Sequence, residues 1–266
     1  MKRIPIVVLL MAGAIRPASA QSPGAVYGGG DTLRFSQVTT IKAVTEGLPM
    51  GPRETNTEIR SRIAVVAGMG DTLRVFYEAS TTTARTPAGE TTTSSNELLG
   101  KPYVVTVSPR GVMTAIAEPP MPGRPAGLGL SNPNWGFGFV MPQTSLVVGA
   151  SWSDTLVQRL PPPIDMTSRR VTRYVVKGDT VLHGDRAWVI EATMTAKMDG
   201  GTPHLDEDVE IAGVGTDGRE TLWFDPRRRI VVQRDGSTTA RTSVRAAAMT
   251  VNSTQTIATT FSLIRP

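Results

Sequence analysis

The feature that most constrains the fold is a hydrophobic period of two along most of the chain. In Leu33–Gln37 and in Leu73–Glu78, residues of opposite polarity alternate one by one. Successive side chains of a strand point to opposite faces of a sheet, so this period predicts strands with one face against a core. Only Val244–Met249 contains consecutive strong helix formers, and its alanines fit a strand equally well. We therefore expect no long helix.

Segments with the same alternation recur along the chain, and residues typical of turns separate them. The turn signals include Gly68–Asp71, Pro109–Gly111, Lys177–Asp179, His183–Asp185, Asp225–Pro226 and Asp235–Gly236. Sequential hairpins in an antiparallel meander fit this order. The further strands predicted are Arg60–Ala67, Tyr103–Val107, Val112–Ala117, Ser153–Gln158, Val171–Lys177, Arg186–Ala196, Val209–Val214, Thr221–Phe224, Ile230–Arg234 and Thr256–Ile264.

Composition favours the same fold class. The 266 residues include 34 Thr, 26 Gly and 20 Pro, which favour strands and turns over helices. A hydrophobic fraction of 39% excludes a polytopic membrane protein and a wholly disordered chain. We predict a mainly β protein, with an antiparallel twisted sheet curled into an open or half-closed barrel and few short helices. The Thr-rich segment Thr81–Asn96 is expected to form a long mobile hairpin loop.

The N-terminus predicts export. A basic start at residues 1–3, an apolar run over Ile4–Ile15 and the small residues Ala18–Ala20 have the order of a secretory signal peptide. The apolar run has about 12 residues, whereas a membrane-spanning helix needs roughly 20. We expect a signal peptide at 1–20, a flexible lead-in at 21–30, and a periplasmic or extracellular protein with no transmembrane segment after cleavage. The chain has no Cys, which excludes disulfides, a lipid anchor on cysteine and cysteine catalysis.

Residues 31–266 are expected to form a single β domain. The Pro- and Gly-rich segment Ala117–Gln143 divides it into two halves of similar size, and Asp-Thr-Leu-Arg occurs at both Asp31–Arg34 and Asp71–Arg74. The repeat is explained either by a duplicated hairpin unit or by the preference for Asp at a turn before a strand. Two smaller β domains joined at 117–143 are the alternative.

The charge of the chain does not indicate a nucleic-acid partner. The formal net charge is +5, and it falls to +2 once Lys2, Arg3 and Arg16 are removed with the signal peptide. The only tight basic cluster is Arg227–Arg229, without interleaved aromatic residues. This cluster either binds an anionic group or forms the polar outside of a hairpin turn.

Four segments carry a resemblance to a known kind of protein. They are Pro142, Val147–Trp152 with Asp154–Thr155, Tyr174–Gly178 and Ala187–Ile190. In this pattern the chain resembles uncharacterised secreted bacterial proteins that are distantly similar to the open β half-barrels of periplasmic lipoprotein carriers. The resemblance implies a lipid or other hydrophobic ligand on the concave face of the sheet, and it assigns no residue a role.

Catalytic and cofactor motifs are not complete in this sequence. Gly149–Ser153 resembles a nucleophile elbow but ends in Ser where Gly is needed, and Gly213–Gly218 has the spacing of a dinucleotide-binding loop but precedes a predicted strand. We interpret Gly213–Gly218 as a hairpin turn, and we predict no catalytic residue, metal site or cofactor. Asp206, Asp208 and Glu210 would share one face of a strand, either as a solvated face or as ligands of a bound ion.

One aromatic segment stands out as a candidate binding site. If it is extended, Trp135, Phe137, Phe139 and Met141 share one face, while Gly136 and Gly138 leave the other nearly bare. This face is expected to form a core strand, to cover an open barrel, or to contact acyl chains or a partner. These four residues are the predicted ligand-binding residues.

The sequence thus predicts an exported non-enzymatic β protein. It would bind an apolar or amphipathic ligand, or an envelope partner, on the concave face of its sheet. One alternative is a structural or assembly protein of the cell envelope that makes contact through Thr81–Asn96 or the aromatic segment. The other is an atypical hydrolase that gathers His183 or His204 with carboxylates in a pocket.

Overall fold

The computed structural model describes residues 32–49, 51–68, 71–94, 99–117, 119, 137–159, 167–199, 204–206, 209–246 and 249–264, and these residues contain strands and no helix. The predicted mainly β class is therefore confirmed, without the few short helices. The strands are β1 (Leu33–Glu46), β2 (Arg53–Ala67), β3 (Thr72–Thr86), β4 (Gly89–Ser94), β5 (Tyr103–Val107), β6 (Met113–Ala117), β7 (Ser151–Arg159), β8 (Thr167–Leu182), β9 (Asp185–Asp199), β10 (His204–Asp206), β11 (Val209–Asp225), β12 (Ile230–Ala246) and β13 (Met249–Ile264).

These strands form one 13-stranded sheet in the order β6-β5-β3-β2-β1-β13-β12-β11-β9-β8-β7, with β4 beside β3 and β10 beside β11. Among the described strands, the first and the last, β1 and β13, pair with each other from Arg34 opposite Ile264 to Glu46 opposite Asn252. Every pairing between named strands is antiparallel, as a meander requires. The strands on either side of the 117–143 segment therefore belong to a single sheet.

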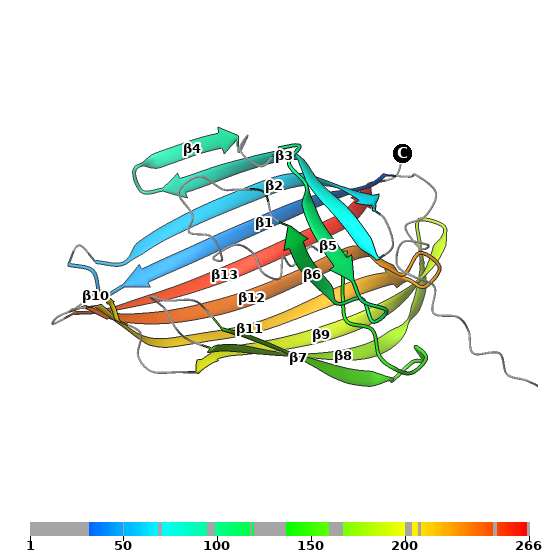
Figure 1. The fold of residues 1–266 in the computed structure, drawn as a ribbon. Coiled ribbons are helices and arrows are strands. Elements are labelled where there is room, and N and C mark those ends of the chain that lie inside the picture. Colours follow the sequence, from blue (N-terminus) through cyan, green and yellow to red (C-terminus); the bar gives the residue numbers. More distant parts are fainter. Residues whose placement is uncertain are drawn as a thin grey trace, which may run out of the picture.

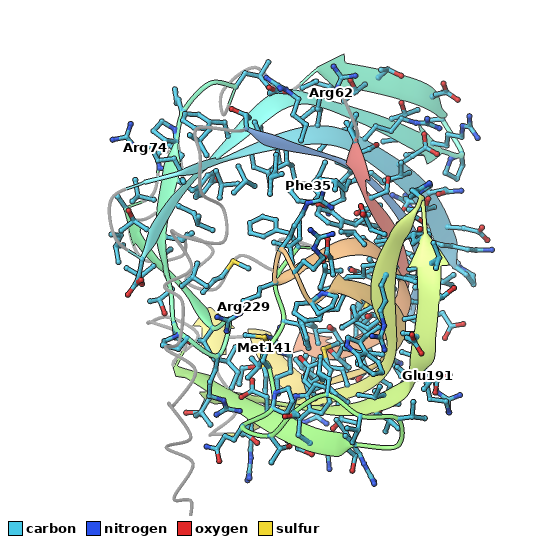
Figure 2. The ribbon with its side chains drawn as sticks, turned by 90° about the vertical axis from the view of Figure 1, so that its right-hand side faces the viewer. Phe35, Arg62, Arg74, Met141, Glu191 and Arg229 are labelled. Atoms are coloured by element: carbon cyan, nitrogen blue, oxygen red, sulfur yellow. The ribbon has the colours of Figure 1, made fainter. Side chains whose placement is uncertain are left out.

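The sheet curls strongly but does not close. Figure 1 shows β5 and β6 crossing in front of the long central strands at one end, while β4 and β10 extend the opposite end. The end-on view of Figure 2 shows the sheet bending around an interior into which Phe35 points, with Arg62 and Arg74 on the outside. Because β6 and β7 are the two ends of the strand order, the predicted open half-barrel is confirmed.

Several predicted turns are wrong, because the strands extend beyond the alternating apolar residues from which they were predicted. Gly213–Gly218 lies inside β11, and Asp235–Gly236 lies inside β12, where Glu220 pairs with Gly236. Lys177–Asp179 lies inside β8 and forms a bulge between Val176 and Gly178. In each case backbone pairing with a neighbouring long strand outweighs the weak local preference of Gly and Asp for turns.

The Thr-rich segment was predicted as a mobile loop, and this prediction is wrong for most of its length. Residues 81–86 continue β3, and Gly89–Ser94 forms β4 in register with them, from Thr81 opposite Ser94 to Thr86 opposite Gly89. Across this hairpin Arg85 Nε donates to Glu90 Oε2 at 2.6 Å. Threonine has a high β propensity, so the two Thr runs pair with each other even though they bury little apolar surface.

The core lies on the concave face and consists of two hydrophobic clusters. The first is centred on Phe35, Phe261 and Phe137 and includes buried residues of β2, β3 and β5. The second includes Phe139 and lies over β8, β9, β11 and the start of β12. Phe137 and Phe139 do not belong to any strand, so a segment without regular structure fills the inside of the half-barrel.

Candidate functional site

Residues 137–150, here called the inner segment, cross the concave face and are fixed to both sides of the curled sheet. The backbone N–H of Val231 donates to the carbonyl of Phe137 at 3.0 Å, and the N–H of Met141 donates to the carbonyl of Arg110 at 2.7 Å. The indole N–H of Trp152 donates to the carbonyl of Val140 at 2.7 Å. Figure 2 shows Met141 of this segment and Arg229 near each other within the curl of the sheet.

The structure brings two of the four predicted binding residues into the core. Phe137 is 1% exposed and stacks on Phe35 with ring centroids 5.5 Å apart. Phe139 is 7% exposed and meets Phe224 edge to face at 4.8 Å. Met141 is half-buried against the second cluster, and Trp135 lies outside the described residues. A role of these residues in ligand binding remains a prediction.

Beside the inner segment the concave face keeps an open groove of about 270 Å³. Gly138, Phe139 and Val140 form one wall. Most of the other lining residues lie on strands β1, β6, β7, β8, β9, β11, β12 and β13. The lining mixes apolar side chains, such as Leu156, Met194 and Ile257, with charged and hydroxyl-bearing ones. The volume lies just below the ~300–1,000 Å³ of typical small-molecule sites.

A buried ion pair connects the groove to the inner segment. The Arg234 side chain is only 6% exposed, and its Nε lies 3.7 Å from Oε2 of Glu220, which is 26% exposed. Arg234 Nη2 also donates to the carbonyl of Gly138 at 2.6 Å. A guanidinium taken out of water needs such partners, so Glu220 and the Gly138 carbonyl together compensate its charge.

Tyr174 lies at the boundary between the second cluster and the groove. Its ring stacks on Trp152 with centroids 5.1 Å apart. Burial, followed by the nearby charge of Glu220, raises the pKa of Tyr174 to about 12. The phenol is therefore neutral at physiological pH and offers the groove a hydroxyl group without charge.

Two glycines leave the base of the groove without side chains. Gly218 of β11 and Gly236 of β12 both line it. A Cβ added at Gly218 would lie 2.8 Å from Oγ1 of Thr238, and one added at Gly236 would lie 2.8 Å from Cβ of Glu220. Glycine inside a strand is typical of places where another group approaches the backbone closely. The sequence analysis missed both residues, because it assigned them to turns.

The other candidate residues do not come together in the part of the chain that the structure describes. His183 is exposed in the turn between β8 and β9, where it lines a small pocket of about 10 Å³ together with Asp185 and Asp225, and Ser151 is exposed at the start of β7. Asp206 belongs to β10 and Glu210 to β11, and the chain reverses between them, so the single-strand interpretation of the acidic run is wrong. Asp208 lies outside the described residues, which contain no group of three or more His, Cys, Asp or Glu able to hold a metal ion.

The arginine triplet is part of a structured turn between β11 and β12. The backbone N–H groups of Arg227 and Arg228 donate to Oδ1 of the buried Asp225 at 2.8 and 3.1 Å. Arg228 also bridges Asp225 and Asp185, at 3.0 Å each. Arg229 donates to the carbonyl of Pro109 at 2.8 Å. These contacts favour the hairpin-turn interpretation over the anion-binding one.

In comparisons with known proteins, no family model and no curated protein match the chain. Weakly similar solved structures include Pseudomonas aeruginosa OccK5 (OpdH), with TM-score 0.29 and 9% identity over 88% of this chain and 99% of that one. A DUF1329 family protein from Desulfovibrio piger has TM-score 0.15 and 9% identity over 90% and 88% of the two chains. A putative outer membrane lipoprotein-sorting protein domain from Vibrio parahaemolyticus has TM-score 0.15 and 10% identity over 86% and 85%.

At such TM-scores these similarities carry no argument about function. In the described part of the chain no helix is sufficiently long and apolar to cross a membrane. A function for this protein has to be inferred from the groove on its concave face.

Proposed function

We propose that the protein is an exported, non-enzymatic binding protein that holds an amphipathic ligand in the groove on its concave face. The observation that carries this proposal is the open groove of about 270 Å³, which persists although the inner segment fills the rest of the half-barrel. Its lining is both polar and apolar. A ligand with a polar head and an apolar tail matches such a surface better than a purely apolar one does.

The apolar part of the ligand has a path that leads out of the groove. Ile257 lines the groove and is paired with Ile41 of β1. Ile59 of β2 is paired with Thr39 of β1. Thr39 is two residues from Ile41, so Ile59, Ile41 and Ile257 lie on the same face of the sheet. All three isoleucines are half-buried. An alkyl chain lying across them would remove this apolar surface from water, at about 25 cal/mol per Å².

The polar part of the ligand would lie beside Arg234, Glu220 and Tyr174. The volume of the groove suits a head group with the first part of a tail, because it is below that of typical sites for complete small molecules. Export is expected from the N-terminal sequence, and an exported binder of amphiphiles would act in the periplasm or outside the cell.

The test uses matched tryptophan variants of β9. Met194 lines the groove, and the adjacent Thr195 is exposed on the convex face. Met194→Trp would fill the groove, and Thr195→Trp places the same side chain outside it. Displacement of the fluorescent probe N-phenylnaphthylamine by dodecyl amphiphiles, below their micelle concentrations, measures binding. We expect Met194→Trp to weaken binding at least tenfold and Thr195→Trp to change it less than twofold.

Ile257→Trp, on β13, gives a second blocking variant, and thermal unfolding shows whether each variant is folded. If no dodecyl amphiphile of any charge binds the unchanged protein, or if folded Met194→Trp and Ile257→Trp both bind normally, the proposed function is wrong.

A further inference from the structure

The charged side chains of the groove balance each other. Arg170 and Arg234 line it together with Asp154 and Glu220, two cations against two anions. Arg219 also lines the groove, but it is exposed and follows Gly218 on the strand, so its charged side chain points to the convex face. The lining therefore presents no net charge to a ligand.

An ionic head would meet a like charge in this groove. An anionic head attracted by Arg170 and Arg234 would also lie close to Asp154 and Glu220, and a cationic head would meet the two arginines. Desolvating a charge is costly unless an opposite charge or several hydrogen bonds compensate it, and here Glu220 and the Gly138 carbonyl already engage Arg234.

The groove is rich in groups that suit an uncharged polar head. Gln37, Thr172, Thr238 and Thr259 line it, and each side chain can both donate and accept a hydrogen bond. Tyr174 adds a hydroxyl that burial keeps neutral. Gly218 and Gly236 add no side chains of their own at the base of the groove, so the side chains of Thr238, Met194 and Glu220 lie close over the backbone there.

We propose that the head group bound in this groove is uncharged and rich in hydroxyl groups, as in a sugar or polyol, so that the ligand is a glycosylated amphiphile. The proposal rests on the proposed function and specifies the class of its ligand. Each sugar hydroxyl donates one hydrogen bond and accepts others, which matches a lining of threonine, glutamine and tyrosine among side chains whose charges balance.

The experiment compares three probes with the same tail. Dodecyl maltoside, dodecanoate and dodecyltrimethylammonium carry an uncharged sugar, an anionic and a cationic head. Isothermal titration calorimetry below each micelle concentration gives the three affinities. We expect dodecyl maltoside to bind at least tenfold more tightly than either ionic probe, with little change between 50 and 300 mM salt, because no net charge is screened.

A matched pair of threonine variants tests the contact itself. Thr238→Val removes a hydroxyl from the groove, and Thr239→Val removes one from the opposite face of the same strand. Loss of one hydrogen bond weakens the affinity by about three- to tenfold. We expect that loss of maltoside affinity for Thr238→Val and less than a twofold change for Thr239→Val.

Glu220→Gln tests the balance of charge. It keeps the shape of the side chain and leaves the lining with one net positive charge. We expect it to raise the ratio of dodecanoate affinity to dodecyl maltoside affinity at least fivefold, because only the anionic head gains from the added positive charge.

The outcomes separate the two proposals. If none of the three probes binds, the proposed function fails. If dodecanoate or dodecyltrimethylammonium binds as tightly as dodecyl maltoside, or if folded Thr238→Val binds maltoside normally, the groove still binds amphiphiles and only the sugar-head inference is overturned.

Discussion

Replacing Phe137 by Ala tests whether the inner segment is an integral part of the fold. The ring is 1% exposed, stacks on Phe35 at 5.5 Å and lies 6.4 Å from Phe261. A buried aromatic side chain removes about 150–250 Å² from water, worth roughly 4–6 kcal/mol at ~25 cal/mol per Å². Alanine keeps part of that, and measured Phe→Ala changes in cores cost about 3–5 kcal/mol. We expect a loss in this range, or about 6–20 °C in melting temperature for a protein of this size.

Urea unfolding followed by circular dichroism measures this loss as a change in the midpoint at constant slope. The matched control is Val148→Ala in the same segment, because Val148 is 63% exposed and should change the unfolding free energy by no more than about 0.5 kcal/mol. A loss below about 1 kcal/mol for Phe137→Ala would show that the inner segment does not pack on the sheet in solution, and the described groove would then lose one of its walls.

Three further changes probe other parts of the same arrangement. Gly111 has φ 82°, and a Cβ added there would meet the carbonyl oxygen of Phe139, whereas Gly51 has φ 83° and open space around it. Gly111→Ala should therefore lower the free energy of unfolding in urea by about 1–3 kcal/mol more than Gly51→Ala does. Because folding raises the pKa of Tyr174 to about 12 from its ordinary 10.0, the neutral phenol stabilises the fold below pH 10 and this contribution is lost as pH rises towards 12. The loss amounts to about 2 kcal/mol, and Tyr174→Phe should lack it in pH-dependent urea unfolding; equal slopes for both proteins would contradict the assignment. Asp225→Ala removes the acceptor of two backbone N–H groups and should lower the free energy of unfolding by about 2–4 kcal/mol, measured by thermal or urea unfolding. The exposed control Asp217→Ala should lower it by about 0.5 kcal/mol. Similar losses for the two variants would refute the turn-capping role of Asp225.

The strand pattern could be predicted from the sequence where one face of a strand packs against the core. Tyr103–Val107 alternates buried and half-buried residues and was predicted with its observed bounds. The full length of β11 and β12 could not be predicted, since residues 213–218 and 235–236 contain the residues that also make turns. Those segments are held by pairing with strands distant in sequence, such as Gly218 opposite Met194, and a local pattern does not contain that information.

The candidate site was only partly accessible to sequence reasoning. The alternation of aromatic residues and glycine around Phe137 and Phe139 correctly indicated an apolar face that something must cover. It could not indicate that the two rings enter different clusters. The groove-lining strand residues come from β1, β6, β7, β8, β9, β11, β12 and β13, and its threonines, arginines and glutamate are ordinary in their local context. Only the curl of the sheet brings them together.

The groove follows from how the half-barrel is filled, since the described residues contain no helix that could cover its concave face. A curled sheet leaves more concave surface than its own side chains can cover, and here a single extended segment supplies Phe137 to one cluster and Phe139 to the other. Gly138 between them has no side chain, and a Cβ at that position would collide with the side chain of Met113, so the segment can lie against β6. Beyond Phe139 the inner segment contributes Val140 to the groove wall, and Gly218 and Gly236 add no side chains from below. The cavity therefore lies between the inner segment, which Gly138 allows to pack against β6, and two strand positions that carry no side chain, and a larger side chain at Gly218 should close it without disturbing Phe137.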